Sequence, residues 1–211
     1  MVGGSGRLGF ARIAACSWMK LAPRSPNTRL ERTAQYAAAQ PQTVMRTMKT
    51  VTFDSTTKPN DPVVLAAVAG GWGVAFASVS LREAKGTDFE VDLKKHNCVA
   101  ELAVWGESSW DKARWGDEVS SDQLEKILAI ISSGSFPKNR SNLSKGQLHQ
   151  LRDAMILEAH RADRRTLFVT GDATAFINNN RREQLQVLLT TRILSTSEFE
   201  AELRAAGMRG V

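Results

Sequence analysis

The segment Thr50-Val51-Thr52-Phe53-Asp54-Ser55-Thr56 decides the fold that this sequence predicts. Its β-branched and aromatic residues indicate a buried strand that ends at Asp54. After a polar loop, Asp61-Pro62 is typical of a helix start, because Asp caps a helix and Pro fits its first position. The apolar residues 63–69 then predict a helix that Gly70-Gly71 ends, and residues 74–79 predict a second buried strand. Strand, helix and strand together indicate a βαβ unit.

The last quarter of the chain repeats this pattern of short strands and helices. Residues 166–170 predict a strand that ends at Gly171-Asp172. A helix is predicted over residues 182–189 and another short strand over residues 191–194. Ser195-Thr196 is a cap signal for the last helix. Helices that follow short buried strands favour a mostly parallel sheet with helices on both faces, so the sequence predicts the α/β class.

The middle of the chain is harder to interpret. We expect residues 86–143 to form an insertion, in which Ser120-Ser121-Asp122 is the cap signal of a clear helix. Trp105, Trp110 and Trp115 stand five residues apart, which fits neither the helical nor the strand period. We expect these tryptophans to pack the inserted subdomain, with a base-stacking surface for nucleic acid as the alternative.

The net charge of +6 belongs to the N-terminal part of the chain. The first 48 residues hold seven basic residues and one acidic residue, and the remainder is neutral. The basic pI is therefore no sign that the domain binds nucleic acid, and only local clusters such as Arg181 and Arg182 are candidate contacts. No stretch approaches the ~20 apolar residues of a membrane span. We therefore expect no membrane partner. Cys16 and Cys98 form no CxxC pair, so we expect a reducing, cytoplasmic setting.

Residues 1–47 differ from the rest in composition. They contain scattered arginines, three prolines and an alanine run without lasting apolar periodicity, which predicts a disordered basic extension. A short basic amphipathic segment or a targeting peptide is the alternative for residues 7–19. Met45 and Met48 stand directly before the first strand, and a mis-called start would explain the extension. We expect one domain over residues 48–211.

Four carboxylates fall where a parallel α/β sheet places its functional sites. Asp54 and Asp172 follow two strands, Glu83 follows the second strand, and Asp153 lies on the helix before the Asp172 strand. Because such sites form beyond the carboxyl ends of the strands, we expect the four acids to meet. Clustered carboxylates repel unless a cation compensates, and Mg²⁺ and Mn²⁺ prefer oxygen ligands. Beside a phosphodiester such ions activate water and stabilise the leaving oxygen, which predicts metal-assisted phosphodiester hydrolysis.

Each acid also has a purely structural explanation. Asp54 could cap the loop after its strand, Asp153 could be a solvated helix residue, and Asp172 could form a turn. Ser80 and Glu83 stand three residues apart, as in a capping box that opens a helix.

Two histidines lie on the helix that Ser144 is expected to begin. His149, Asp153 and His160 lie near one face of this helix. His149 and His160 are about 16 Å apart along an ideal helix, too far to share one ion. We therefore expect them to be polar flanks of an amphipathic helix.

Three segments together resemble the PIN domain family of ribonucleases, which includes toxins of bacterial toxin–antitoxin pairs. The segments are residues 51–56, residues 79–83, and Asp153-Ala154 with residues 168–172. Asp153 and Asp172 stand nineteen residues apart, a spacing similar to that of the third and fourth acids of the family. Residues 192–199 also resemble its last strand and helix, so the resemblance covers roughly 50–85 and 145–205.

This resemblance implies a three-layer α/β/α sandwich, dependence on Mg²⁺ or Mn²⁺, and cleavage of single-stranded RNA. The catalytic and metal-binding acids that it implies are Asp54, Glu83, Asp153 and Asp172. Thr170 and Thr56 would support the site through their hydroxyls. A toxin role, an antitoxin partner and a homodimer are further expectations that it leaves open.

Two departures from the family pattern keep other functions open. Asn is common where Thr56 and Gly171 stand, and both changes remove an amide that could orient a ligand. The alternative is a catalytically degenerate PIN-like module that binds RNA or a partner without cutting. A haloacid-dehalogenase-like phosphatase also begins with a strand that ends in Asp, but the second Asp that it needs two residues later is Thr56 here.

Overall fold

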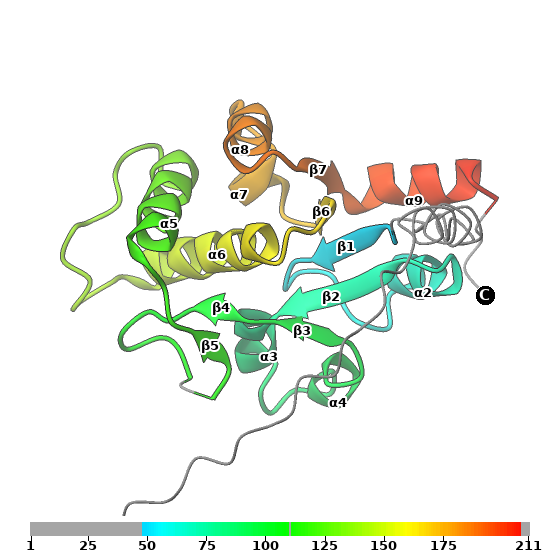
Figure 1. Ribbon diagram of the computed structural model, residues 1–211, viewed down its shortest axis with the longest axis horizontal. Helices are drawn as coiled ribbons and strands as arrows, with labels where there is room; N and C mark the ends of the chain where they lie inside the picture. The colour runs from blue at the N-terminus through cyan, green and yellow to red at the C-terminus, as the bar shows by residue number, and fades with distance from the viewer. Residues whose placement is uncertain (1–47, 110, 208–211) are drawn as a thin grey trace, which may run out of the picture. The chain divides into compact units, whose positions relative to one another are not determined.

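Five parallel strands in the order β3-β2-β1-β6-β7 form the central sheet of the computed structural model, which describes residues 48–109 and 111–207 (Figure 1). The strands are β1 (Thr50–Phe53), β2 (Gly73–Ala77), β3 (Asn97–Val99), β6 (Leu167–Thr170) and β7 (Arg192–Ser195). Parallel neighbours need crossover connections, which helices supply here. The predicted α/β class with a parallel sheet is confirmed. The extension predicted at residues 1–47 lies outside the described residues.

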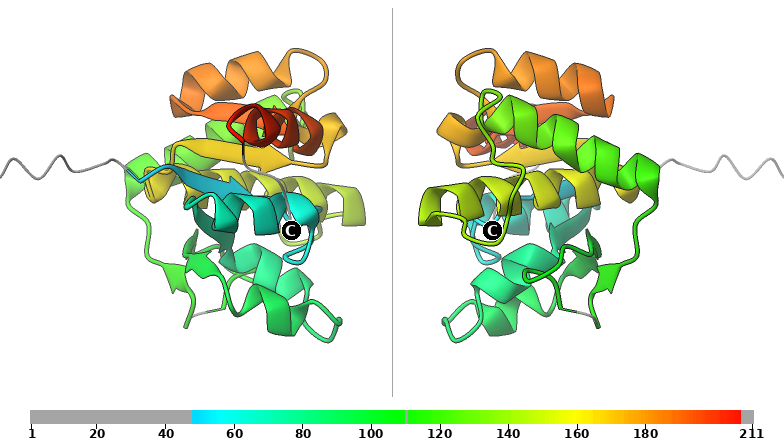
Figure 2. Two further views of the ribbon diagram at one scale, coloured as in Figure 1. Left: turned by 90° about the vertical axis from the view of Figure 1, so that its right-hand side faces the viewer. Right: turned by 90° about the vertical axis from the view of Figure 1, so that its left-hand side faces the viewer.

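Helices cover both faces of this sheet and complete an α/β/α sandwich (Figure 2). One face carries α5 (Glu118–Ile131), α6 (Lys145–Ala162) and α8 (Arg181–Leu189), and the other carries α2 (Pro62–Ala69) and α9 (Thr196–Ala205). Side chains along β6 alternate between the two cores: Phe168 packs with α5 and α6, whereas Leu167 and Val169 pack with α2 and α9. In the part of the chain that the structure describes, no helix combines the length and apolar character needed to cross a membrane.

Local signals account for several helix starts. The Asp61 carboxylate accepts a hydrogen bond of 2.9 Å from a backbone N–H in the first turn of α2. Ser144 with Gln147 and Ser195 with Glu198 form capping boxes at α6 and α9. These side chains satisfy N–H groups that have no partner within the helix. The predicted starts of these three helices are confirmed.

The predicted capping box at Ser80 is wrong. The helix α3 (Ser78–Glu83) begins three residues earlier, directly after β2, and Ala77 occupies the cap position without a side-chain hydrogen bond. The second strand is therefore shorter than predicted. Glu83 is the last residue of α3, so the capping explanation for this acid does not apply.

The region predicted as an insertion, residues 86–143, also contributes to the central sheet. After the short helix α4 (Glu90–Leu93), strand β3 pairs with β2 at the edge of the sheet. Strands β4 (Glu101–Leu102) and β5 (Ala113–Arg114) form a separate two-stranded sheet. Helix α5 begins earlier than predicted, because the Asp117 side chain caps it instead of residues 120–122.

Two ion pairs, each between a buried glutamate and a partly exposed arginine, connect this small sheet to the main domain. Glu101 of β4 is fully buried, pairs with Arg82 of α3, and accepts a hydrogen bond of 2.9 Å from Ser78 Oγ. Glu158 of α6 is also fully buried and pairs with Arg114 of β5. Because a buried charge is costly without a partner, these pairs fix where the small sheet lies.

The tryptophans of this region were predicted to pack in its interior. Trp105 and Trp115 instead lie at the surface, with 88% and 77% of their area exposed. Trp110 lies outside the described residues. The packing prediction is therefore wrong for Trp105 and Trp115.

Candidate metal centre

Two of the four predicted acids follow neighbouring strands of the sheet. Asp54 comes directly after β1, and Asp172 is the second residue after the end of β6. Phe53 and Val169 are paired, and the N–H of Asp54 donates to the carbonyl of Val169 at 3.1 Å. Both acids therefore lie at the carboxyl edge of the sheet, where parallel α/β sheets form their sites.

The Asp54 side chain is held by three threonine hydroxyls. It is 1% exposed, and Thr56 Oγ1 lies 2.7 and 2.9 Å from its two oxygens. Thr57 Oγ1 donates to Oδ1 at 3.2 Å, and Thr170 Oγ1 donates to Oδ2. Hydrogen bonds to an ionised acceptor are strong, so this set fixes the orientation of the carboxylate. Thr56 and Thr170 were predicted to support the site, whereas Thr57 was not.

The same hydroxyls connect Asp54 to the segment that carries Asp172. Thr170 Oγ1 accepts a hydrogen bond of 2.9 Å from the N–H of Asp172. Thr56 Oγ1 accepts one of 3.1 Å from the N–H of Gly171. The ends of β1 and β6 are thus joined by side chains beyond their last backbone pair.

Glu83 and Asp153 approach this edge from two helices. Glu83 ends α3, Asp153 lies in the middle of α6, and the two helices pack together. Both acids line a cavity of about 490 Å³, and Asp172 lines it as well. Asp54 does not line the cavity, but Thr56, which holds it, does.

Asp172 has a structural role besides its place in the cavity. One of its carboxylate oxygens accepts a hydrogen bond of 2.9 Å from the N–H of Ala175 and so caps the short helix α7 (Ala173–Phe176). This contact fits the structural explanation of Asp172 as a turn residue and leaves its second oxygen to face other groups.

Asp153 shows the electrostatic effect of the cluster. Its pKa is raised from 3.8 to about 7, first because burial disfavours the charged form and then because Asp172, Glu83 and Asp54 repel its charge. Like charges raise the pKa of an acid only when they are close enough to interact. The other three predicted acids therefore lie close enough to Asp153 to repel its charge, and Glu83 and Asp172 line the same cavity.

Three basic side chains that line the same cavity were not predicted as site residues. They are Lys58, His149 and Arg152. Arg152 Nε donates to Glu107 at 3.0 Å, and its second nitrogen Nη1 lies 3.5 Å from Glu83. Arg152 directly precedes Asp153 in the sequence, but no local pattern indicates its contact with Glu107, which comes from the loop after β4.

The two histidines of α6 differ from one another. His149 is exposed, as expected of a polar flank, but the same expectation is wrong for His160, which is fully buried. The two ring nitrogens of His160 lie 2.9 Å from Thr52 Oγ1 and 2.8 Å from Thr191 Oγ1. Burial lowers the pKa of His160 to about 3, so the ring is neutral and serves the core.

The donor chemistry of the cluster suits a hard divalent cation, because carboxylate oxygens are what Mg²⁺ and Mn²⁺ prefer. Burial is the main cause of the raised pKa of Asp153, and such a cation would relieve the second cause, repulsion by the neighbouring acids. Among residues 48–109 and 111–207, however, no three Asp, Glu, His or Cys side chains form a group that could hold one ion. Both carboxylate oxygens of Asp54 accept hydrogen bonds from threonine hydroxyls, and Glu83 lies 3.5 Å from Arg152 Nη1. A cation would therefore compete with these contacts.

The predicted nucleic-acid contacts Arg181 and Arg182 lie elsewhere. Arg181 donates to the carbonyl of Thr174, and Arg182 pairs with Glu198 at 2.8 Å. Neither arginine lines the acidic cavity. Their contact with nucleic acid stays a prediction.

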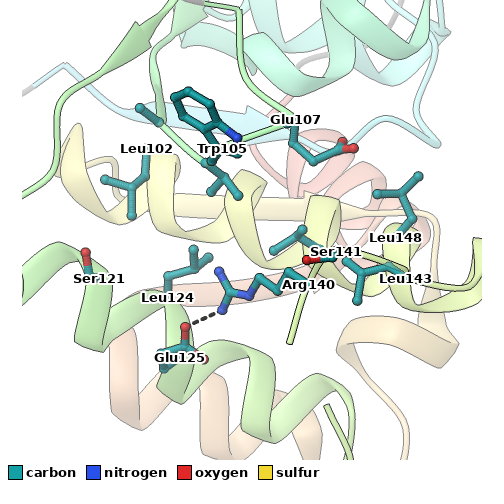
Figure 3. Close-up of a pocket in the computed structure, with 14 residues that line it drawn as sticks. Leu102, Trp105, Glu107, Ser121, Leu124, Glu125, Arg140, Ser141, Leu143 and Leu148 are labelled. Atoms are coloured by element: carbon teal, nitrogen blue, oxygen red, sulfur yellow. Dashed lines mark hydrogen bonds and ion pairs between the residues drawn. The ribbon is translucent and has the colours of Figure 1, made fainter. Parts of the chain in front are cut away.

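A second cavity of about 730 Å³ lies beside the loop after β4, between α5 and α6 (Figure 3). Leucines and Trp105 line it, and Arg140 pairs with Glu125 on its wall. Glu107, the partner of Arg152, lines it too. None of the four clustered acids does, so its greater volume does not make it the better candidate for chemistry.

The acid cluster, its threonine contacts and the basic side chains of the cavity are the features of this chain from which its function is inferred. Comparison of the chain with protein-family models, with curated proteins and with solved structures finds no match, so the resemblance to PIN domains stays a prediction.

Proposed function

We propose that this chain is a Mg²⁺- or Mn²⁺-dependent hydrolase that cleaves phosphodiester bonds of single-stranded RNA. The observation that carries the proposal is that Glu83, Asp153 and Asp172 line one cavity at the carboxyl edge of a parallel sheet, next to the buried Asp54. Burial, and then repulsion by the other three acids, raises the pKa of Asp153 to about 7. Strongly shifted pKa values that arise from burial and charged neighbours in a cavity are typical of functional sites. The resemblance to PIN domains supports the same chemistry and supplies the substrate class.

The residues of the cavity have distinct tasks in this proposal. The acids that would hold the cation are Asp54, Glu83, Asp153 and Asp172. When bound, the cation activates water and stabilises the leaving oxygen. Thr56, Thr57 and Thr170 hold Asp54 in one orientation. Because the pKa of Asp153 is raised to about 7, cation binding would displace the proton that this acid holds at or below that pH, since ligands bind metal in their ionised form.

Cleavage of a labelled single-stranded RNA by the full chain tests this proposal. We expect cleavage in Mg²⁺ or Mn²⁺, none in EDTA, and loss of cleavage in Asp54→Asn and Asp172→Asn, which keep the side-chain size but remove a charge. Asp122→Asn is the matched control, because this acid lies on the exposed surface of α5 and pairs only with Lys126 among the ion pairs of the described residues. Full activity of the Asp54 and Asp172 variants would rule out the proposed site.

A second candidate function is a degenerate PIN-like module that binds RNA or a protein partner without cutting it. Within the described residues no three Asp, Glu, His or Cys side chains are grouped so that they could hold one ion, which favours this alternative. Thr56 and Gly171, which stand in place of Asn, favour it too. Such a module would show neither cleavage nor appreciable cation affinity. The antitoxin partner and the homodimer stay predictions from the resemblance.

A further inference from the structure

The cavity that Glu83, Asp153 and Asp172 line is also lined by the basic side chains of Lys58 and Arg152. Lys58 comes from the loop after β1, and Arg152 comes from α6 next to Asp153. A site that bound only a cation would gain nothing from these charges, because positive neighbours oppose cation binding. A ligand that carries its own negative charge next to the cation would use both sides of the cavity.

Both basic groups are held by contacts within the chain. Lys58 Nζ lies 5.5 Å from the centre of the Phe89 ring, and Phe89 also lines the cavity. Arg152 is held between Glu107 and Glu83 and is 25% exposed. A guanidinium has five N–H donors, so two carboxylate contacts leave donors for a further acceptor. Arginine suits the forked geometry of phosphate oxygens, and lysine binds phosphate as a point charge.

The rest of the lining combines apolar side chains with hydroxyls such as those of Thr56, Thr57 and Ser80. Phe76, Phe89 and Leu93 line the cavity beside the basic groups. Its volume of about 490 Å³ lies within the range of about 300–1,000 Å³ that is usual for sites that enclose a small molecule. A lining with charged, hydroxyl and apolar side chains suits a nucleotide unit better than a bare inorganic anion.

We propose that Lys58 and Arg152 form a phosphate-binding subsite, which holds a phosphodiester group of single-stranded RNA beside the acid cluster. This inference rests on the proposed function for the identity of the ligand. The phosphate would lie next to the acids, because Arg152 directly precedes Asp153 and its Nη1 lies 3.5 Å from Glu83.

Binding of a short, fluorescently labelled single-stranded RNA, measured by anisotropy over a series of salt concentrations in Mg²⁺, tests the subsite. The full chain carries Asp172→Asn in every sample, so that the probe is not consumed, and Asn also serves as a helix cap. We expect Arg152→Gln and Lys58→Gln each to weaken binding about tenfold, as loss of a charged hydrogen bond does. Each is also expected to reduce the slope of log K against log salt by about 0.7, the value for one phosphate contact on a single strand.

Lys145→Gln is the matched control. Lys145 is the exposed first residue of α6, does not line the cavity, and carries the same charge. This variant shows how much affinity is lost when any one exposed positive charge is removed. We expect it to change neither the affinity nor the salt slope appreciably. Arg152→Lys keeps the charge, so it should retain the salt slope while losing part of the affinity.

Equal losses of RNA affinity in Lys145→Gln and Arg152→Gln would contradict the proposed subsite. Absence of RNA binding by the Asp172→Asn chain would contradict it as well. Failure of the proposed function has a different signature: the salt slope still depends on Arg152 and Lys58, but the unmodified chain cleaves nothing. Arg152→Gln loses its contacts with Glu83 and Glu107, so its thermal unfolding is measured in parallel. Lys58→Gln loses only the contact with the Phe89 ring among the contacts described above. If the Arg152 variant unfolds, the RNA affinity and salt slope of Lys58→Gln therefore test the subsite.

Discussion

The backbone N–H of Gly171 donates a hydrogen bond of 3.1 Å to Thr56 Oγ1, and a Cβ atom at position 171 would lie only 2.7 Å from that oxygen. Thr56 in turn donates to Asp54. The two positions at which this chain departs from the PIN pattern therefore fit one another, because the missing side chain at Gly171 makes room for the Thr56 hydroxyl. Together they preserve the orientation of Asp54 without either asparagine.

Gly171→Ala is expected to lower the free energy of unfolding by about 1–3 kcal/mol, because the new methyl group overpacks against a hydroxyl that Asp54 holds in place. In a Thr56→Ala background the same exchange should cost less, since the oxygen is gone. A double-mutant cycle by urea denaturation should give a coupling energy of about 0.5–3 kcal/mol between the two positions.

Gly146 is the control glycine for this cycle. A Cβ atom there meets no heavy atom within 4 Å, and the residue lies in α6. Gly146→Ala should stabilise the chain by roughly 0.5–1 kcal/mol through its helix propensity. Strictly additive losses at positions 56 and 171 would contradict the proposed fit.

The raised pKa of Asp153 predicts a pH-dependent stability when metal is removed with EDTA. The folded chain keeps this proton up to about pH 7, whereas the unfolded chain releases it near the ordinary pKa of 3.8. The contribution of Asp153 to the free energy of unfolding is therefore fully present below about pH 4 and is lost as the pH rises through about 7.

Asp153→Asn should remove this dependence. The variant should resemble the unmodified chain at pH 4 and exceed it in stability at pH 8, by on the order of 4 kcal/mol at most. Urea denaturation at the two pH values in EDTA measures the difference. A gap between the two proteins that stays constant with pH would show that Asp153 titrates normally.

Removing Arg114 alone should lower the free energy of unfolding more than replacing both Arg114 and Glu158 by apolar residues. Arg114→Met leaves Glu158 buried without its partner and is expected to lower the free energy of unfolding by about 3–5 kcal/mol. Burial already raises the pKa of Glu158, so the loss should be smaller at pH 5 than at pH 8, where the acid cannot easily take up a proton.

The double variant Arg114→Met/Glu158→Leu is the test of this explanation. An apolar replacement of both partners removes the buried charge, so most of the lost stability should return. A double variant as unstable as Arg114→Met would indicate that the small sheet depends on the ion pair itself.

Local signals made much of the fold predictable. The strand before Asp54 and the helices capped by Asp61, Ser144 and Ser195 depend on residues adjacent in sequence, and the structure confirms them. The positions of Asp54 and Asp172 at one edge of the sheet follow from parallel pairing alone.

Other features depend on contacts that no local pattern records. Ser80 and Glu83 have the spacing of a capping box, but α3 starts at the very end of β2 and passes through Ser80. The short strand β3 has two exposed residues and so lacks the apolar signature of a central strand. The Arg152 side chain is held in the cavity partly by its hydrogen bond to Glu107, which lies 45 residues away in the sequence.

Calorimetric titration of Mn²⁺ into the full chain tests most directly whether the four acids form one cation site, and it does so without knowledge of the RNA. We predict saturable binding that weakens by at least about tenfold, or about 1.4 kcal/mol, in Asp153→Asn and does not change in Asp122→Asn. Binding should also tighten as the pH rises through about 7, where Asp153 loses its proton. Absence of Mn²⁺ binding, or equal affinity of the Asp153 variant and the unmodified chain, would contradict the metal centre and favour the degenerate module.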